Sequence, residues 1–156
     1  MDDSARDAYV AGLKLLARRE LSEKQVRERL RRKEYENDDI DSAIARLKSD
    51  RALDDTRFAH ALARHEISTK RHGRLRAQRQ LESAGVPPPL ARAALDEALG
   101  QVDQDALIES ALSRRLRGDA TIDDEAQFRR LYRFLIGQGF DSERALRVLK
   151  RHRPLK

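Results

Sequence analysis

The chain has 156 residues, of which 38% are charged and 4% are aromatic, and its formal net charge is +6. This length allows one ordinary domain or a few small repeated units, and the scarcity of aromatic residues argues against one large core. The absence of cysteine excludes disulfides, thiolate catalysis and cysteine-based metal sites. No apolar run approaches the roughly 20 residues of a membrane span, and the acidic start of the chain lacks an apolar signal core, so we expect a soluble, cytoplasmic protein.

The first part of the chain is predicted to form three helices, because glycine, proline and β-branched residues are sparse and apolar residues recur at helical spacing. The first helix covers residues 5–19. Ser22 and Gln25 form a capping-box pattern that opens the second helix, and Asn37 is predicted to cap the third. The apolar faces of these helices are carried by Tyr9, Leu13 and Leu16, by Val26 and Leu30, and by Ile40, Ile44 and Leu47.

The string Leu-Asp-Asp-Thr-Arg-Phe-Ala at residues 53–59 joins this part of the chain to the next helix. The carboxylates of Asp54 and Asp55 can accept hydrogen bonds from exposed N–H groups in the first turn of that helix. Phe58 falls on its apolar face and is predicted to be buried. Arg57 is predicted to pair with the preceding part of the chain and so to fix the angle between the first and second helical units. We interpret these four residues as a structural junction, and their direct contact with a partner protein stays open as the alternative.

A second and a third group of helices are predicted to follow. The second group begins near Asp55, and its apolar positions are Phe58, Leu62, Leu75 and Leu81. Gly85 supplies the turn that ends its middle helix, and the three prolines at residues 87–89 begin its last helix, where a missing N–H is tolerated. The third group begins near Asp103, and its apolar positions are Leu107, Ala111, Leu112, Phe128, Leu131, Leu135, Leu146 and Leu149.

One apolar spacing recurs in all three groups. A leucine precedes a second apolar residue by five positions, and an aliphatic residue follows later, at Leu30/Tyr35/Ile44, Leu81/Val86/Leu95 and Leu135/Phe140/Leu149. Self-similarity at a period of roughly 50 residues indicates stacked helical units. We therefore predict an all-α fold of three tandem three-helix repeats in an elongated, curved row, with the repeats at residues 1–52, 53–101 and 102–156. Each unit has few large apolar side chains, so contacts between neighbouring units must add stability.

This pattern resembles the RecX family of recombinase regulators. The resemblance is strong over about residues 8–99. The matching segments are residues 15–22, 26–33, 53–59, 72–75 and 81–86, together with Leu135, Gly139 and Phe140 in the third unit. The chain departs from the family pattern at Glu34, where a glycine is usual, and at the three consecutive prolines.

The resemblance implies a non-catalytic regulator that needs no cofactor and binds the RecA recombinase, free and as a filament on single-stranded DNA. RecX proteins lie along the helical groove of the filament and inhibit its ATPase, strand-exchange and co-protease activities. This implies a role in DNA repair, DNA recombination and the SOS response. Direct binding to DNA is expected to be weaker. We expect a monomer, because no segment of the sequence indicates an interface between copies of the chain.

Basic residues form the candidate binding surfaces. The main cluster, called here the second-unit cluster, contains a single acid, Glu66, and consists of Arg64, Lys70, Arg71, Arg74, Arg76 and Arg79. Within it, a predicted loop at residues 68–73 leads into a helix N-terminus, a setting that suits phosphate or carboxylate. A secondary basic surface is predicted at Arg27, Arg31, Arg147, Lys150 and Arg151, and Arg144, Arg153 and Lys156 extend its C-terminal part. A merely solvated helix face stays open as the alternative there.

Two other functions stay open. The protein could be a basic helical DNA-binding protein that acts directly on DNA, although no unit presents an obvious recognition helix with base-reading side chains. It could also be a helical-repeat scaffold for another protein. The four histidines have no partner at the spacing of a metal site or a catalytic triad, which argues against an enzyme.

Overall fold

The computed structural model describes residues 1–116 and 121–154. Within these ranges the chain forms nine α-helices and one π-helical turn, and it has no strand, which confirms the predicted all-α class. The elements are α1 (Asp3–Arg18), α2 (Glu23–Arg32), α3 (Asn37–Ser49), α4 (Asp55–Arg64), η1 (His65–Thr69), α5 (Arg74–Ser83), α6 (Pro88–Gly100), α7 (Gln104–Leu116), α8 (Glu125–Gly137) and α9 (Ser142–Arg151).

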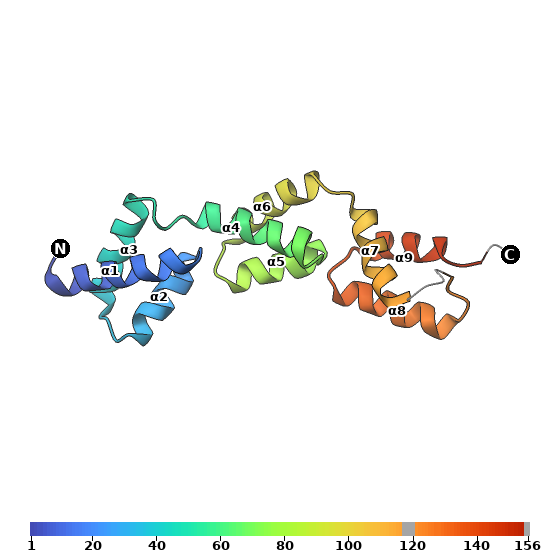
Figure 1. Ribbon diagram of the computed structural model, residues 1–156, viewed down its shortest axis with the longest axis horizontal. Helices are drawn as coiled ribbons and strands as arrows, with labels where there is room; N and C mark the ends of the chain where they lie inside the picture. The colour runs from blue at the N-terminus through green and yellow to red at the C-terminus, as the bar shows by residue number, and fades with distance from the viewer. Residues whose placement is uncertain (117–120, 155–156) are drawn as a thin grey trace.

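The helices form an elongated row of three groups, with α1 in the group at one end and α9 in the group at the other (Figure 1). Helices α1–α3 make up the first group, α4–α6 the second and α7–α9 the third. Each group buries its own apolar cluster, which includes Leu30 and Ile44 in the first group, Leu81 in the second, and Leu135 in the third. Leu107 packs against both the second and the third cluster. The row therefore depends on three thin cores and on the seams between them.

The apolar spacing found in the sequence corresponds to one repeated turn. In each group the middle helix ends with a backbone hydrogen bond that spans five residues, from Tyr35 N to Leu30 O, from Val86 N to Leu81 O and from Phe140 N to Leu135 O, at 3.3, 3.0 and 3.2 Å. The residue before each donor has a positive φ, namely 68° at Glu34, 99° at Gly85 and 94° at Gly139. This is the Schellman arrangement, which favours glycine at the position of positive φ. Glu34 is therefore the strained member of the three.

Replacing Glu34 with glycine is expected to raise the free energy of unfolding by about 1 kcal/mol, because glycine adopts positive φ without the clash that a Cβ atom suffers there. Urea denaturation followed by circular dichroism measures the change. The matched control is Lys33→Gly, one residue earlier, where φ is −85° and glycine relieves no strain. A gain in stability at Lys33, or none at Glu34, would contradict this explanation.

The predicted N-terminal cap is confirmed at the second helix, α2, but not at the third, α3. Ser22 and Gln25 form the complete capping box of α2. The predicted cap at Asn37 is wrong, since Asn37 is the first residue of α3 and Glu36, without a side-chain cap, stands before it. The tight turn that ties Tyr35 to Leu30 lets the helix begin one residue earlier than expected.

The predicted apolar face of α1 is also shifted in the structure. The fully buried positions are the small residues Ala5, Ala8 and Gly12, and a Cβ atom on Gly12 would lie 2.7 Å from Leu47 Cδ1 of α3. The expected residues Tyr9, Leu13 and Leu16 are only partly buried at the edge of the first cluster. The small residues allow α1 and α3 to approach closely, and this leaves the larger side chains at the border of the contact.

Candidate partner and nucleic-acid interface

The second-unit cluster extends from the end of α4, through η1, into α5. Three of its cations are held by neighbours. Lys70 Nζ lies 3.3 Å from Glu66, Arg74 lies 2.7 Å from Asp96, and Arg71 donates a hydrogen bond to Ser110 of α7. Among the described residues, no carboxylate forms an ion pair with the other three members, Arg64, Arg76 and Arg79. The charge of these three arginines is therefore not neutralised by a carboxylate of the described residues; Arg64 and Arg79 are exposed, and Arg76 is partly buried.

Glu66, the single acid in this cluster, is 1% exposed, so its carboxylate does not compete with an outside anion for the arginines at the surface. Its Oε2 atom lies 2.5 Å from His72 Nδ1, and its backbone carbonyl accepts a hydrogen bond from His72 N at 2.9 Å. A buried carboxylate needs such partners, because an unpaired charge in the interior is strongly destabilising. The predicted loop at residues 68–73 is partly wrong, since η1 extends to Thr69 and the Glu66–His72 pair closes the remaining turn. Sequence periodicity does not reveal a π-helical turn of this kind.

At the start of α5, two of the N–H donors expected at this helix N-terminus already have acceptors in the third helix group. Gly73 N donates to Gln138 O at 2.8 Å, and Leu75 N donates to Gly139 O at 3.1 Å. The two backbones approach this closely because neither glycine carries a Cβ atom. A Cβ on Gly73 would lie 2.3 Å from Gly139 C. Two N–H groups at this N-terminus therefore join the second and third groups.

Leu75 departs from its predicted place in the second apolar cluster. It is 53% exposed. It borders a small hollow at the same seam, and Leu99, Leu107 and Phe140 also line this hollow. Docking of the turn that contains Gly139 onto the first turn of α5 leaves Leu75 at the rim of the seam, outside the core.

The secondary basic surface is divided between paired and unpaired residues. Arg27 contacts Asp41 at 2.6 Å and Glu23 at 3.4 Å. The hydrogen bond to Asp41 is the main reason why the pKa of Arg27 lies above its usual value. Arg31 is exposed, and no ion pair holds it within the described part of the chain. The α2 face thus presents less free charge than its sequence suggests.

At the C-terminal end, three arginines of α9 converge on Asp105 of α7. Arg144 and Arg147 lie 3.1 Å from Asp105 Oδ1, and Arg151 lies 3.2 Å from Oδ2. Desolvation by burial raises the pKa of Asp105, but hydrogen bonds from Arg147 and Arg144 and the nearby positive charge outweigh it and hold this pKa below its usual range. Arg147 and Arg151 therefore stabilise the third group. Lys150 is exposed, and Lys156 lies outside the described residues.

Because its pKa is lowered on folding, Asp105 stabilises the protein above its unfolded pKa of about 3.9, and this contribution disappears as the pH falls through the folded pKa. At pH 7, Asp105→Asn is expected to lower the free energy of unfolding by about 1 kcal/mol. Below about pH 4 the difference from the unsubstituted protein should shrink. Thermal unfolding at pH 7 and pH 3 measures the difference in stability between the variant and the unsubstituted protein. The control is Asp7→Asn, which removes an exposed carboxylate on α1. An equal difference at pH 3 and pH 7 would contradict the role of Asp105.

The junction residues hold the first and second groups together. Asp54 caps α4 by accepting hydrogen bonds from Thr56 N and Arg57 N at 2.9 and 3.1 Å. Asp55 instead accepts from Glu23 N at 2.8 Å and so reaches the first turn of α2.

Arg57 adds a second set of contacts across this junction. Its Nε atom lies 2.6 Å from Glu20 Oε1, and its terminal nitrogens donate to the carbonyls of Arg51 and Ala52 at 3.1 Å. Phe58 is 7% exposed within the second cluster. Three of the five N–H donors of this guanidinium are thus used within the chain, across the junction, which favours the structural interpretation.

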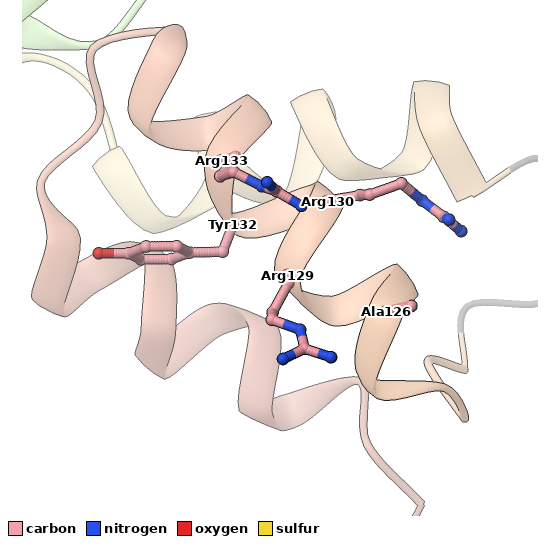
Figure 2. A pocket seen from close by; sticks show the side chains of 5 residues that line it. All are labelled: Ala126, Arg129, Arg130, Tyr132 and Arg133. Atoms are coloured by element: carbon pink, nitrogen blue, oxygen red, sulfur yellow. The ribbon is translucent and has the colours of Figure 1, made fainter.

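A further basic surface lies on α8 and was missed in the sequence. Arg129, Arg130 and Arg133 are exposed and, with Ala126 and the half-buried Tyr132, line a shallow hollow (Figure 2). We call this surface the α8 arginine face. The missed signal was the absence of any acid from residue 126 to residue 140, the same criterion that selected the second-unit cluster.

Neither a metal site nor a membrane span is found in the described residues. No group of three or more His, Cys, Asp or Glu side chains in residues 1–116 and 121–154 could hold a metal ion. None of the helices in these ranges is both long and apolar enough to cross a membrane. The candidate interface thus consists of basic surfaces on a helical row.

Solved structures share this fold. The crystal structure of RecX from Lactobacillus salivarius matches with a TM-score of 0.76 at 20% identity and covers 97% of both chains. A second crystal structure, of a regulatory protein RecX, matches with a TM-score of 0.78 at 20% identity, over 95% of this chain and 72% of the other. At this identity the likeness concerns the fold alone.

The sequence comparisons concern the family as well as the fold. Family models for the first and second three-helix domains of RecX match residues 8–47 and 54–95. The regulatory protein RecX of Syntrophotalea carbinolica is 31% identical over 137 residues, which cover 87% of this chain and 90% of that protein. The regulatory protein RecX of Chlorobaculum tepidum is 31% identical over 151 residues, which cover 96% and 91%. The chain therefore belongs to the RecX family of regulatory proteins.

Proposed function

We propose that this protein is a non-catalytic, cytoplasmic regulator of the RecA recombinase. It binds RecA both free and as a filament on single-stranded DNA, and it inhibits the ATPase, strand-exchange and co-protease activities. By this route it modulates DNA repair, recombination and the SOS response. It acts as a monomer, without a cofactor, through three repeats at residues 1–52, 53–101 and 102–156.

Family membership is the observation that carries this proposal. The shape of the molecule supports it, because a row of three helix groups can follow a helical groove across several subunits of a filament (Figure 1). The seams contain polar contacts, such as the hydrogen bond that Glu23 N donates to Asp55. Such seams permit small adjustments between neighbouring groups.

The unpaired arginines of the second-unit cluster are the proposed contact with the filament. Arg64, Arg76 and Arg79 lack carboxylate partners among the described residues, so their charge is not neutralised within the chain. Guanidinium groups bind carboxylate and phosphate in the same bidentate manner, and either could be presented by a nucleoprotein filament.

The test is the affinity for RecA filaments assembled on single-stranded DNA, measured by biolayer interferometry. The variant that carries Arg64→Ala, Arg76→Ala and Arg79→Ala is expected to bind about tenfold more weakly, a change of about 1.4 kcal/mol. The control carries Lys14→Ala, Arg18→Ala and Arg32→Ala, which remove the same charge from exposed positions of the first group. Equal weakening by both variants would contradict a specific role of the second-unit cluster. No filament binding by the unsubstituted protein would contradict the proposed function.

A further inference from the structure

The α8 arginine face belongs to none of the surfaces assigned so far. We propose that it binds single-stranded nucleic acid, with Arg129, Arg130 and Arg133 on successive phosphates and Tyr132 against a base. This inference deepens the proposed function and rests on it, because a nucleoprotein filament is where the protein would meet single-stranded nucleic acid. Its test uses nucleic acid without recombinase, so a failure of this inference can be distinguished from a failure of the proposed function.

The charge of this face is not neutralised by the chain. Among the described residues, no carboxylate forms an ion pair with any of the three arginines. Glu125, one turn before Arg129, is engaged elsewhere, because Arg153 lies 2.7 Å from its carboxylate and also stacks 4.0 Å from the centre of the Phe128 ring. Asp124 accepts a hydrogen bond from Ala126 N at 2.9 Å and caps the helix. The acids closest in sequence are therefore held at the start of α8, and the face beyond them stays positive.

The spacing of the side chains leaves room for an anion between them. Arg129 and Arg133 are one helical turn apart, about 6 Å along the axis, and Arg130 stands beside them on the same exposed side. Ala126, one turn before Arg130, lines the hollow with only a methyl group. In Figure 2, Tyr132 and Arg130 project to opposite sides of α8 and Arg129 lies between them. A polyanion that crosses the helix would meet several guanidinium groups in succession.

Tyr132 determines the class of ligand. It packs partly against the third apolar cluster and is half-buried, so its ring is held in place while it also lines the hollow. A base stacks on such a ring, and an arginine-rich surface beside an aromatic side chain is the combination that binds single strands without sequence preference. A surface for an acidic protein would need the arginines but not the ring. The aromatic residue therefore favours a single-stranded nucleic acid.

The test is fluorescence anisotropy with a labelled single-stranded oligothymidine, over a series of salt concentrations and without recombinase. Three phosphate contacts contribute about −2 to the slope of log affinity against log salt. The variant with Arg129→Ala, Arg130→Ala and Arg133→Ala should lose this part of the slope. The control variant with Lys14→Ala, Arg18→Ala and Arg32→Ala should keep it.

A second pair of variants tests the stacking. Tyr132→Ala is expected to weaken binding about tenfold, whereas Tyr132→Phe retains the ring and should bind as the unsubstituted protein does. Duplex DNA should bind more weakly than the single strand, because its bases are not free to stack on Tyr132. Thermal unfolding of each variant verifies that the third group is folded.

Three results would overturn the inference. One is an unchanged salt slope in the α8 variant, which would leave the arginines as a solvated face. Another is full binding by Tyr132→Ala, or equal binding of duplex and single strand. The third is unchanged DNA binding together with a loss of filament binding in the α8 variant, which would assign the face to an acidic protein surface. Filament binding by the unsubstituted protein is measured in parallel, so that failure of the proposed function is recognised separately.

Discussion

Replacing Gly139 with alanine is expected to separate the second and third helix groups and to lower the free energy of unfolding by about 3 kcal/mol or more. Gly139 has a φ of 94°, and a Cβ atom on it would lie 2.3 Å from Arg76 N, a backbone atom that a side-chain rotation does not move. The hydrogen bonds from Gly73 N to Gln138 O and from Leu75 N to Gly139 O would then break. Urea denaturation measures the loss of stability, and small-angle scattering measures the separation.

Gly137→Ala is the matched control for this prediction. Gly137 lies two residues earlier, at the end of α8, and a Cβ atom there would meet no atom within 4 Å outside the adjoining backbone of its own helix. This variant should be as stable as the unsubstituted protein or more stable by up to about 1 kcal/mol, because alanine favours the helix. Equal behaviour of the two variants would show that the seam does not depend on close backbone approach.

Replacing Phe58 with alanine is expected to lower the free energy of unfolding by about 3 to 5 kcal/mol. Phe58 is 7% exposed and packs in the second apolar cluster, directly after the junction that ties α4 to α2. Each group has a thin core, so the cavity left by one aromatic ring removes a large share of its buried contacts. The thermal midpoint and the midpoint of urea denaturation should both fall.

Leu75→Ala provides the comparison for Phe58. Leu75 is also a large apolar residue of the second group, but it is 53% exposed, so its truncation should change stability by about 0.5 kcal/mol or less. An unchanged midpoint for Phe58→Ala would mean that the ring is not buried in solution, and would favour the alternative in which the junction contacts a partner protein.

Local chemistry made much of this fold predictable from the sequence. Helical periodicity gave the helices, and the capping box at Ser22 and the proline start of α6 gave their beginnings. The recurring leucine spacing marks the repeated turn in the sequence, because the hydrogen bond across five residues and the residue of positive φ both lie within a segment of six residues. Glu34 stands out for the same reason, as a non-glycine residue at a position of positive φ.

What the sequence did not predict depends on contacts between distant residues. Two donors at the start of α5, Gly73 N and Leu75 N, are satisfied by the carbonyls of Gln138 and Gly139, which belong to another helix group. The three arginines of α9 converge on Asp105 only after α7 and α9 have packed. Basic residues that look alike in sequence therefore divide into paired, structural ones and unpaired ones, and only the folded chain separates them. The α8 arginine face is predictable from the sequence, because its lack of acids is a local signal.

The ATPase rate of RecA on single-stranded DNA, titrated with this protein at substoichiometric ratios, tests the regulatory role most directly. A parallel measurement gives the affinity of the protein for the same DNA without RecA. Strong inhibition at concentrations where little naked DNA is bound is the predicted result, because a regulator of the filament must act through RecA. Unchanged ATPase activity, together with tight and salt-dependent binding to naked DNA, would contradict the proposed function and would indicate a basic helical protein that acts on DNA itself.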